Sequence, residues 1–226
     1  MEQSLYVMIS STGSGMGKTI QKVTGFPYNH VSLSLDNRLQ EWISFARLNI
    51  SAPLAGGLVE ESSGRFATIG KTMPVRIFRI PLSQEEYASL QDFRDGILSD
   101  REKLTYNSFD AAASALGLRF PVKGAYTCLA FANAVLHTRF FSISELNDGL
   151  SRFLMYEGDF FRLVPPETPP KEAYLTPWGK GHAVISTVRH FVFLLCRVIA
   201  PGRFSDPICT RCDALPPLLS EREATG

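Results

Sequence analysis

Four stretches in the first third of the chain have the apolar-rich or alternating pattern of β-strands. They cover residues 5–10, 28–35, 39–45 and 75–80. Asp36 and Asn37 lie between the second and third stretches and favour a turn, so these two strands are expected to form a hairpin. Residues 46–74 contain many Gly, Ser and Pro residues and are expected to form a long loop with a short strand in it.

Helical spacing begins after residue 83. Ser83 and Glu86 fit a capping box, and apolar residues follow at intervals of three or four as far as Ile97, which predicts an amphipathic helix over 84–98. Three further helices of the body are expected over 106–116, 128–137 and 143–156.

The pattern changes near Pro165, where prolines begin to recur. We therefore expect a body over 1–165 and an appendage over 166–226 that comprises a Pro-rich linker, one apolar helix near 182–199 and a flexible tail. Arg189, His190 and Arg197 interrupt that helix, which argues against a membrane-spanning segment. Contact with a membrane surface and docking on the body are both compatible with the pattern.

Composition narrows the classes of function only slightly. The chain has 226 residues, of which 45% are hydrophobic, and a formal net charge of +1, so nothing indicates a nucleic-acid partner. The N-terminus lacks a basic region followed by a long apolar run, which predicts a cytoplasmic protein. In that reducing compartment the four cysteines do not predict a disulfide framework.

Two motifs resemble sites for a phosphate or a metal. Residues 13–19 read GSGMGKT, but a P-loop would need its first glycine at position 12, which is Thr12. Cys209 and Cys212 have the spacing of half a zinc-ribbon set, and no second pair accompanies them. We therefore interpret the first as a loop and the second as two free thiols, and expect neither cofactor nor metal.

Cys128 is the candidate nucleophile. Thr127 can cap the predicted helix, which places the thiol in its first turn, where the helix dipole and unpaired N–H groups favour a thiolate. The same N–H groups can donate to an oxyanion on a bound carbonyl. A single cysteine in an apolar segment is nevertheless most often a buried packing residue.

His30 is the candidate base. It lies on the polar face of the strand over 28–35, and an imidazole on a rigid strand can form a thiolate–imidazolium pair and later protonate a leaving group. His137, at the end of the Cys128 helix, and His182 and His190, in the appendage, are weaker candidates.

Four blocks together resemble a bacterial group of the circularly permuted papain-like superfamily, relatives of NlpC-type peptidases and lecithin–retinol acyltransferase. They read YNHVSLSLD, LQEWISFAR with PLAGGLVEE, AYTCLAFANAVL and LMYEG, and the likeness spans roughly residues 5–160. In permuted members the histidine strand precedes the cysteine helix, as His30 precedes Cys128 here. The resemblance implies an α+β fold in which an antiparallel sheet packs against helices. It also implies an NlpC-like catalytic domain over 1–165, with Cys128 as nucleophile and His30 as base.

Permuted relatives place a polar residue that orients the histidine on the following strand, where Glu41 and Ser44 are the candidates. A two-residue turn would pair Ser32 with Glu41, whereas a three-residue turn would set Ser44 opposite His30. A carboxylate stabilises an imidazolium better than a hydroxyl does, so Glu41 is preferred.

These residues predict a cysteine-dependent hydrolase of the amidase or peptidase type, which works through an acyl-enzyme on a peptide, amide or other acyl-bearing substrate. A thioesterase or acyltransferase that acts on lipid-like acyl groups is one alternative. The other is a non-catalytic binding or scaffold protein with the same fold.

Overall fold

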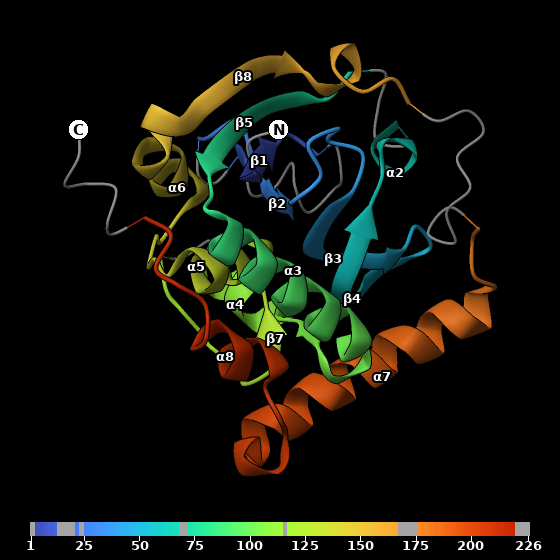
Figure 1. The fold of residues 1–226 in the computed structure, drawn as a ribbon. Coiled ribbons are helices and arrows are strands. Elements are labelled where there is room, and N and C mark those ends of the chain that lie inside the picture. Colours follow the sequence, from blue (N-terminus) through green and yellow to red (C-terminus); the bar gives the residue numbers. More distant parts are fainter. Residues whose placement is uncertain are drawn as a thin grey trace.

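An antiparallel sheet of six strands lies at the centre of the computed structural model, which describes residues 3–12, 21–22, 25–67, 72–114, 117–166 and 176–219 (Figure 1). The strand order is β4-β3-β2-β1-β5-β8. The strands are β1 (Ser4–Ser10), β2 (His30–Ser34), β3 (Trp42–Asn49), β4 (Ala52–Glu61), β5 (Pro74–Pro81) and β8 (Leu154–Asp159). Two short strands, β6 (Thr105–Tyr106) and β7 (Ala125–Tyr126), pair in parallel beside this sheet.

The α-helices are α2 (Ser63–Ala67), α3 (Gln84–Ser99), α4 (Ser108–Ser114), α5 (Cys128–Leu136), α6 (Ile143–Gly149), α7 (Lys180–Ile199) and α8 (Pro207–Cys212). Short 3-10 turns are η1 (Arg101–Lys103), η2 (Ser151–Phe153), η3 (Phe160–Arg162) and η5 (Pro201–Arg203). The predicted capping box is confirmed: Ser83 accepts from the Glu86 N–H, and the Glu86 carboxylate accepts from the Ser83 N–H. The expected α+β class, with an antiparallel sheet packed against helices, is confirmed as well.

Both faces of the sheet are covered. Alternate residues of β1 show this, because Val7 and Ile9 belong to a large apolar cluster while Tyr6 and Met8 belong to a smaller one. The large cluster joins the sheet to α3, α5 and α8, and the smaller one joins it to α2 and η3. Figure 1 shows α3, α5 and α8 gathered below the sheet. It shows α2 away from these helices, beyond the upper end of β4.

Two segments differ from the sequence-based expectation. Within 46–74, β3 continues to Asn49 and forms a long hairpin with the ten-residue strand β4, so little of the expected loop is present in the described part. The helix expected over 143–156 ends at Gly149, and β8 follows it. Pairing with β5 satisfies the β8 backbone, so tertiary contacts outweigh the local helical pattern there.

The segment over 180–219 docks on the body, unlike the flexible tail that the sequence predicts. Ile208, Cys212 and Leu218 are buried in the large cluster with the sheet and α5. Asp206 caps α8 and also accepts hydrogen bonds from the Gly124 N–H and the Tyr126 hydroxyl. The proline-rich sequence gives no indication of this packing, because α8 is buried by partners that lie far away in the sequence. The P-loop-like residues 13–19 fall outside the described residues.

Candidate active site

The first residue of β2 and the first residue of α5 meet at one end of the sheet. These are His30 and Cys128, and the neighbouring Cys128 side chain contributes to the raised pKa of His30. Each residue is 8% exposed. The helix α5 packs against β2 and β3 through its apolar residues, which fixes the position of its N-terminus relative to His30.

Local sequence explains why α5 begins at the thiol. The Thr127 hydroxyl accepts a hydrogen bond from the Ala130 N–H, as expected for an N-cap. Cys128 therefore occupies the first turn, where backbone N–H groups have no acceptor within the helix. Small residues such as Ala132, which is fully buried, allow the helix to approach the sheet closely.

A buried carboxylate lies on the other side of the histidine ring. Glu61, the last residue of β4, has its two oxygens 3.1 and 3.2 Å from His30 Nε2. The hydroxyls of Ser32 and Ser44 each donate to Glu61 Oε2 at 2.7 Å, and Arg65 Nε lies 3.5 Å from Oε1. Glu61 is only 5% exposed, so this polar network replaces almost all of its hydration.

The electrostatics of this network favour a charged pair. Burial alone would lower the pKa of His30, but the charge of Glu61 and hydrogen bonds to Cys128 and Glu61 raise that pKa to about 10. Burial would raise the pKa of Glu61, whereas His30, Arg65 and Ser32 together lower it to about 2. Near neutral pH the imidazole is therefore protonated and the carboxylate is ionised.

The structure does not place Glu41 at His30. Glu41 is exposed and precedes β3, and its backbone oxygen accepts a hydrogen bond from the Ser34 hydroxyl. Neither predicted hairpin register occurs, because Leu33 pairs with Ile43 across a longer loop that the Asp36 carboxylate holds through backbone N–H groups. In this register Ser44 lies beside Ser32, and it reaches Glu61 rather than His30.

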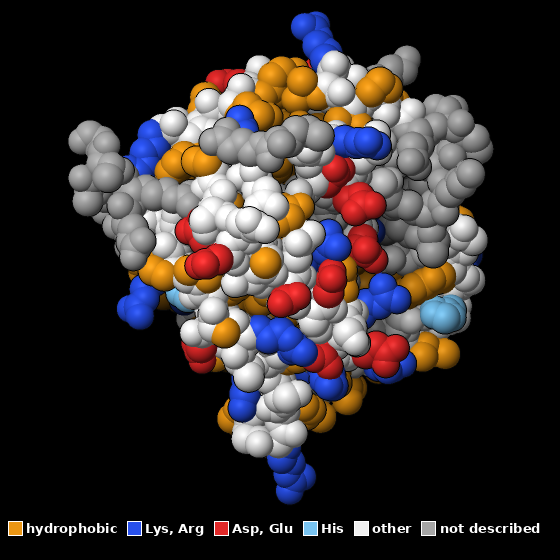
Figure 2. Space-filling model, in the orientation of Figure 1, with side chains coloured by type: hydrophobic (Ala, Val, Ile, Leu, Met, Phe, Trp, Pro, Cys, Tyr) orange, Lys and Arg blue, Asp and Glu red, His pale blue; other side chains and the backbone are white. Residues whose placement is uncertain are grey.

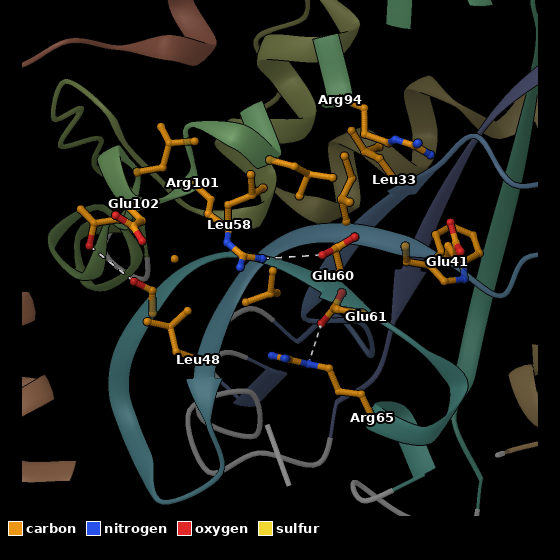
Figure 3. Close-up of a pocket in the computed structure, with 18 of the residues that line it drawn as sticks. Leu33, Glu41, Leu48, Leu58, Glu60, Glu61, Arg65, Arg94, Arg101 and Glu102 are labelled. Atoms are coloured by element: carbon orange, nitrogen blue, oxygen red, sulfur yellow. Dashed lines mark hydrogen bonds and ion pairs between the residues drawn. The ribbon is translucent and has the colours of Figure 1, made fainter. Parts of the chain in front are cut away.

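Sequence reasoning missed Glu61 because residues 46–74 were interpreted mainly as a loop. The signal was present at the end of PLAGGLVEE, where two carboxylates follow an apolar run. Figure 3 shows their side chains pointing to opposite sides of β4, with Glu60 toward Arg101 and Glu61 toward Arg65. Which of the two faces His30 depends on the β3–β4 register, in which Glu61 pairs with Trp42.

A second polar group lies next to His30 on β1. Ser10 pairs with His30 across the two strands, and its fully buried hydroxyl has no hydrogen-bond partner among the described residues. Beside it, Asn29 exchanges hydrogen bonds with the backbone of Thr12 and accepts one from its hydroxyl. These contacts fix the start of β2 and thereby the position of the imidazole.

A cavity of about 950 Å³ lies between β4, α3 and α7, and Figure 3 shows part of its lining. Leu33, Leu58, Leu90 and Phe93 contribute apolar surface, and Glu61 reaches the cavity with its carboxylate. Neither Cys128 nor His30 lines this cavity. The cavity therefore meets the polar network at Glu61 and not at the thiol.

The remaining cysteines have different surroundings. Cys196 and Cys209 are exposed, Cys212 is buried, and all of them are free thiols. Burial, together with the neighbouring Cys209, Asp206 and Asp213, raises the pKa of Cys212 to about 12. Within the described residues no group of three or more His, Cys, Asp or Glu side chains is arranged to hold a metal ion.

Comparison of the chain with protein-family models, curated proteins and solved structures gives no match. The roles of Cys128, His30 and Glu61 are therefore inferred from their own contacts.

Proposed function

We propose that the protein is a cysteine-dependent hydrolase of amide or peptide bonds that works through an acyl-enzyme on Cys128. The observation that supports this proposal is the buried series Cys128–His30–Glu61, in which the carboxylate oxygens lie 3.1 and 3.2 Å from the imidazole. A thiol, an imidazole held on a rigid strand and a carboxylate behind it are the three parts of a nucleophile–base–orienting arrangement.

The chemistry follows from the charges of the network. Since Glu61 keeps His30 protonated, an imidazolium lies beside the Cys128 sulfur and balances the negative charge that the sulfur carries during attack. With Nε2 held by Glu61, Nδ1 is the ring nitrogen left for the sulfur. The thiolate attacks the carbonyl carbon and forms a C–S bond, and the C–N bond breaks as His30 donates its proton to the departing amine.

Water completes the cycle. Neutral His30 takes a proton from a water molecule, whose oxygen attacks the thioester and releases the acid, and the thiolate–imidazolium pair is restored. Glu61 remains ionised throughout and orients the ring. The N–H groups of the first turn of α5, that of Cys128 among them, supply donors for the oxyanion that forms in each half-reaction.

The order of the elements supports a permuted papain-like arrangement. The histidine strand β2 comes before the cysteine helix α5 in the chain, and α5 packs against that strand. His30 and Cys128 thus meet from two elements whose sequence order is the one that the resemblance implies.

A thioesterase or acyltransferase that acts on lipid-like acyl groups is the second candidate. The cavity beside Glu61 favours it, because Leu33, Leu58, Leu90 and Phe93 form an apolar part of its lining and a volume of about 950 Å³ has room for an alkyl chain, although the thiol lies outside it. The two candidates share the acyl-enzyme and differ in the group that leaves.

The test uses the full chain with aminoacyl-coumarin amides and with p-nitrophenyl esters of short and long acyl chains. We expect an acyl adduct on Cys128 by peptide mass mapping, and a fall of about a thousandfold or more in turnover for Cys128→Ala. Cys209→Ala, which removes an exposed thiol, is the matched control and should retain full turnover.

The substrate series separates the candidates. Cleavage of the amides supports the amidase, whereas turnover confined to long-chain esters supports the acyl-lipid alternative. A folded protein whose Cys128 takes no acyl group from any of these substrates would contradict both and favour a binding role.

A further inference from the structure

The helix α7 exposes a continuous apolar stripe. By its length and composition it is the one helix among the described residues that could cross a membrane, yet it lies against the body. Its outward residues are more than a third exposed, and the most exposed reaches 73%. These outward residues are Val184, Ile185, Val188, Val192, Leu195 and Ile199. Figure 2 shows hydrophobic side chains at the lower edge of the molecule, where Figure 1 draws α7.

The opposite face of α7 is fixed to the body and includes two buried polar side chains, His190 and Arg197. The ring of His190 is hydrogen-bonded to the hydroxyls of Thr105 and Ser108, at 3.0 and 3.2 Å. Arg197 is 2% exposed, donates to the backbone oxygens of Lys103 and Lys123, and stacks between two phenylalanine rings. A spanning helix would have to move both side chains into hydrocarbon, so α7 is suited to lie along a surface rather than across a bilayer.

The charges on α7 point to one kind of surface. Residues 180–199 include Lys180, Arg189 and Arg197 but no acidic residue. At 100° per residue, Lys180 and Arg189 flank the apolar stripe on opposite sides, and both are exposed. A second α7 would bring these two cations no carboxylate, whereas an anionic bilayer supplies phosphate groups along both edges of the stripe.

We propose that α7 seats the protein on an anionic phospholipid membrane surface. The apolar stripe enters the boundary between headgroups and acyl chains, while Lys180 and Arg189 extend to the lipid phosphates. His190 and Arg197 keep the body attached to the helix from the other side. This proposal is independent of the thiol chemistry proposed above.

The test is flotation of the full chain with vesicles of phosphatidylcholine alone and of phosphatidylcholine with phosphatidylserine. Truncation at residue 165 is unsuitable, because it would remove Ile208 and Leu218 from the core. The test variant is Ile185→Glu/Val192→Glu, both at exposed positions. The control is Leu154→Glu on β8, an exposed leucine at the other edge of the sheet from β4, the strand against which α7 packs.

We expect the wild-type chain and Leu154→Glu to float with the anionic vesicles and to bind the neutral vesicles about tenfold more weakly. Ile185→Glu/Val192→Glu should lose at least about tenfold in binding to the anionic vesicles, with an unchanged melting temperature. Equal binding of this variant and the wild type would overturn the proposal.

Sedimentation velocity without lipid tests whether a second copy of this chain covers the apolar stripe of α7. A wild-type dimer that Ile185→Glu/Val192→Glu converts to a monomer, together with no flotation, would assign the stripe to a second copy of this chain and overturn the membrane proposal. A wild-type monomer that floats with anionic vesicles supports it.

Discussion

The helices α5 and α7 are both rich in apolar residues but have opposite surroundings. Most of α5 is buried between the sheet and α8, and its polar residues Thr127 and Cys128 stand at its N-terminus. In α7 the buried residues include His190 and Arg197, while most of its valines, leucines and isoleucines face outward. One helix buries its apolar side chains together with its thiol, and the other buries two polar side chains and exposes an apolar stripe.

This difference shows that apolar content alone does not determine which face of a helix packs. Buried polar groups need hydrogen-bond partners, and the position of those partners determines which face of the helix turns toward the body. Arg197 finds the carbonyl oxygens of Lys103 and Lys123, and a Cβ on Gly124 would collide with its guanidinium. On the α5 side, Glu61 finds His30 and two serine hydroxyls.

Removal of the Glu61 carboxylate, which contacts His30, should lower the free energy of unfolding more than any other substitution that we propose. Glu61→Ala leaves a buried imidazolium, Arg65 and two hydroxyls without their shared acceptor, so the free energy of unfolding should fall by about 3–5 kcal/mol. Glu41→Ala, at the exposed residue that the sequence favoured, should change it by less than about 0.5 kcal/mol. Urea denaturation measures both, and similar losses for the two variants would contradict the assignment of Glu61.

The corresponding test on α7 contrasts its two faces. Arg197→Met keeps the apolar stem but leaves two buried carbonyl oxygens without donors, which should cost about 2–4 kcal/mol of unfolding free energy. Val192→Ala on the outer face should cost less than about 0.5 kcal/mol in solution. If denaturation showed the larger loss for Val192→Ala, the outer face would be buried in solution.

The pH dependence of stability should come from the His30–Glu61 pair. The raised pKa of His30 adds stability that is complete below 6.5 and is lost as the pH rises toward about 10. The lowered pKa of Glu61 adds stability that is present above 4.5 and is lost as the pH falls toward about 2. Between about pH 6 and about pH 9 the unfolding free energy should therefore decrease by about 3 kcal/mol.

Glu61→Gln is the control for this profile, because it keeps the shape of the side chain but carries no charge. Its unfolding free energy should vary less over the same pH range, when both proteins are measured in urea at constant ionic strength. An equally steep decrease in the variant would assign the pH dependence to other groups.

The smallest effect is expected at the N-cap of α5. Thr127→Ala removes the acceptor for the Ala130 N–H and should lower the unfolding free energy by about 1 kcal/mol. Thr127→Ser keeps the hydroxyl and should remain within about 0.5 kcal/mol of the wild type. Thermal or urea denaturation distinguishes the two variants. Equal losses of unfolding free energy would show that the hydroxyl cap does not stabilise α5.

Local pattern predicted the parts of the molecule that local forces determine. The helices at 84–98, 128–137 and 182–199 are confirmed to within a few residues, since capping and apolar spacing act over a single turn. The structure also brings Cys128 and His30 together, although 98 residues separate them. That proximity was expected only through the resemblance of four sequence blocks to permuted papain-like proteins.

Contacts that depend on register or on distant partners were not predictable in this way. Glu61 faces His30 because the β2–β3 and β3–β4 pairings have particular registers, and a shift of one residue would turn Glu60 inward instead. The burial of α8 likewise depends on the sheet, α3 and α5 already being in place. Neither a turn motif nor a proline count specifies such contacts.

The position of Leu218 has a consequence for synthesis of the chain. This fully buried side chain closes the same core that contains Val7 and Cys128. When α5 has left the ribosome, the Cys128 thiol belongs to a body whose core still lacks the side chains of α8 and Leu218. The large cluster, and with it the setting of Cys128, can become complete only after residue 218 has left the exit tunnel.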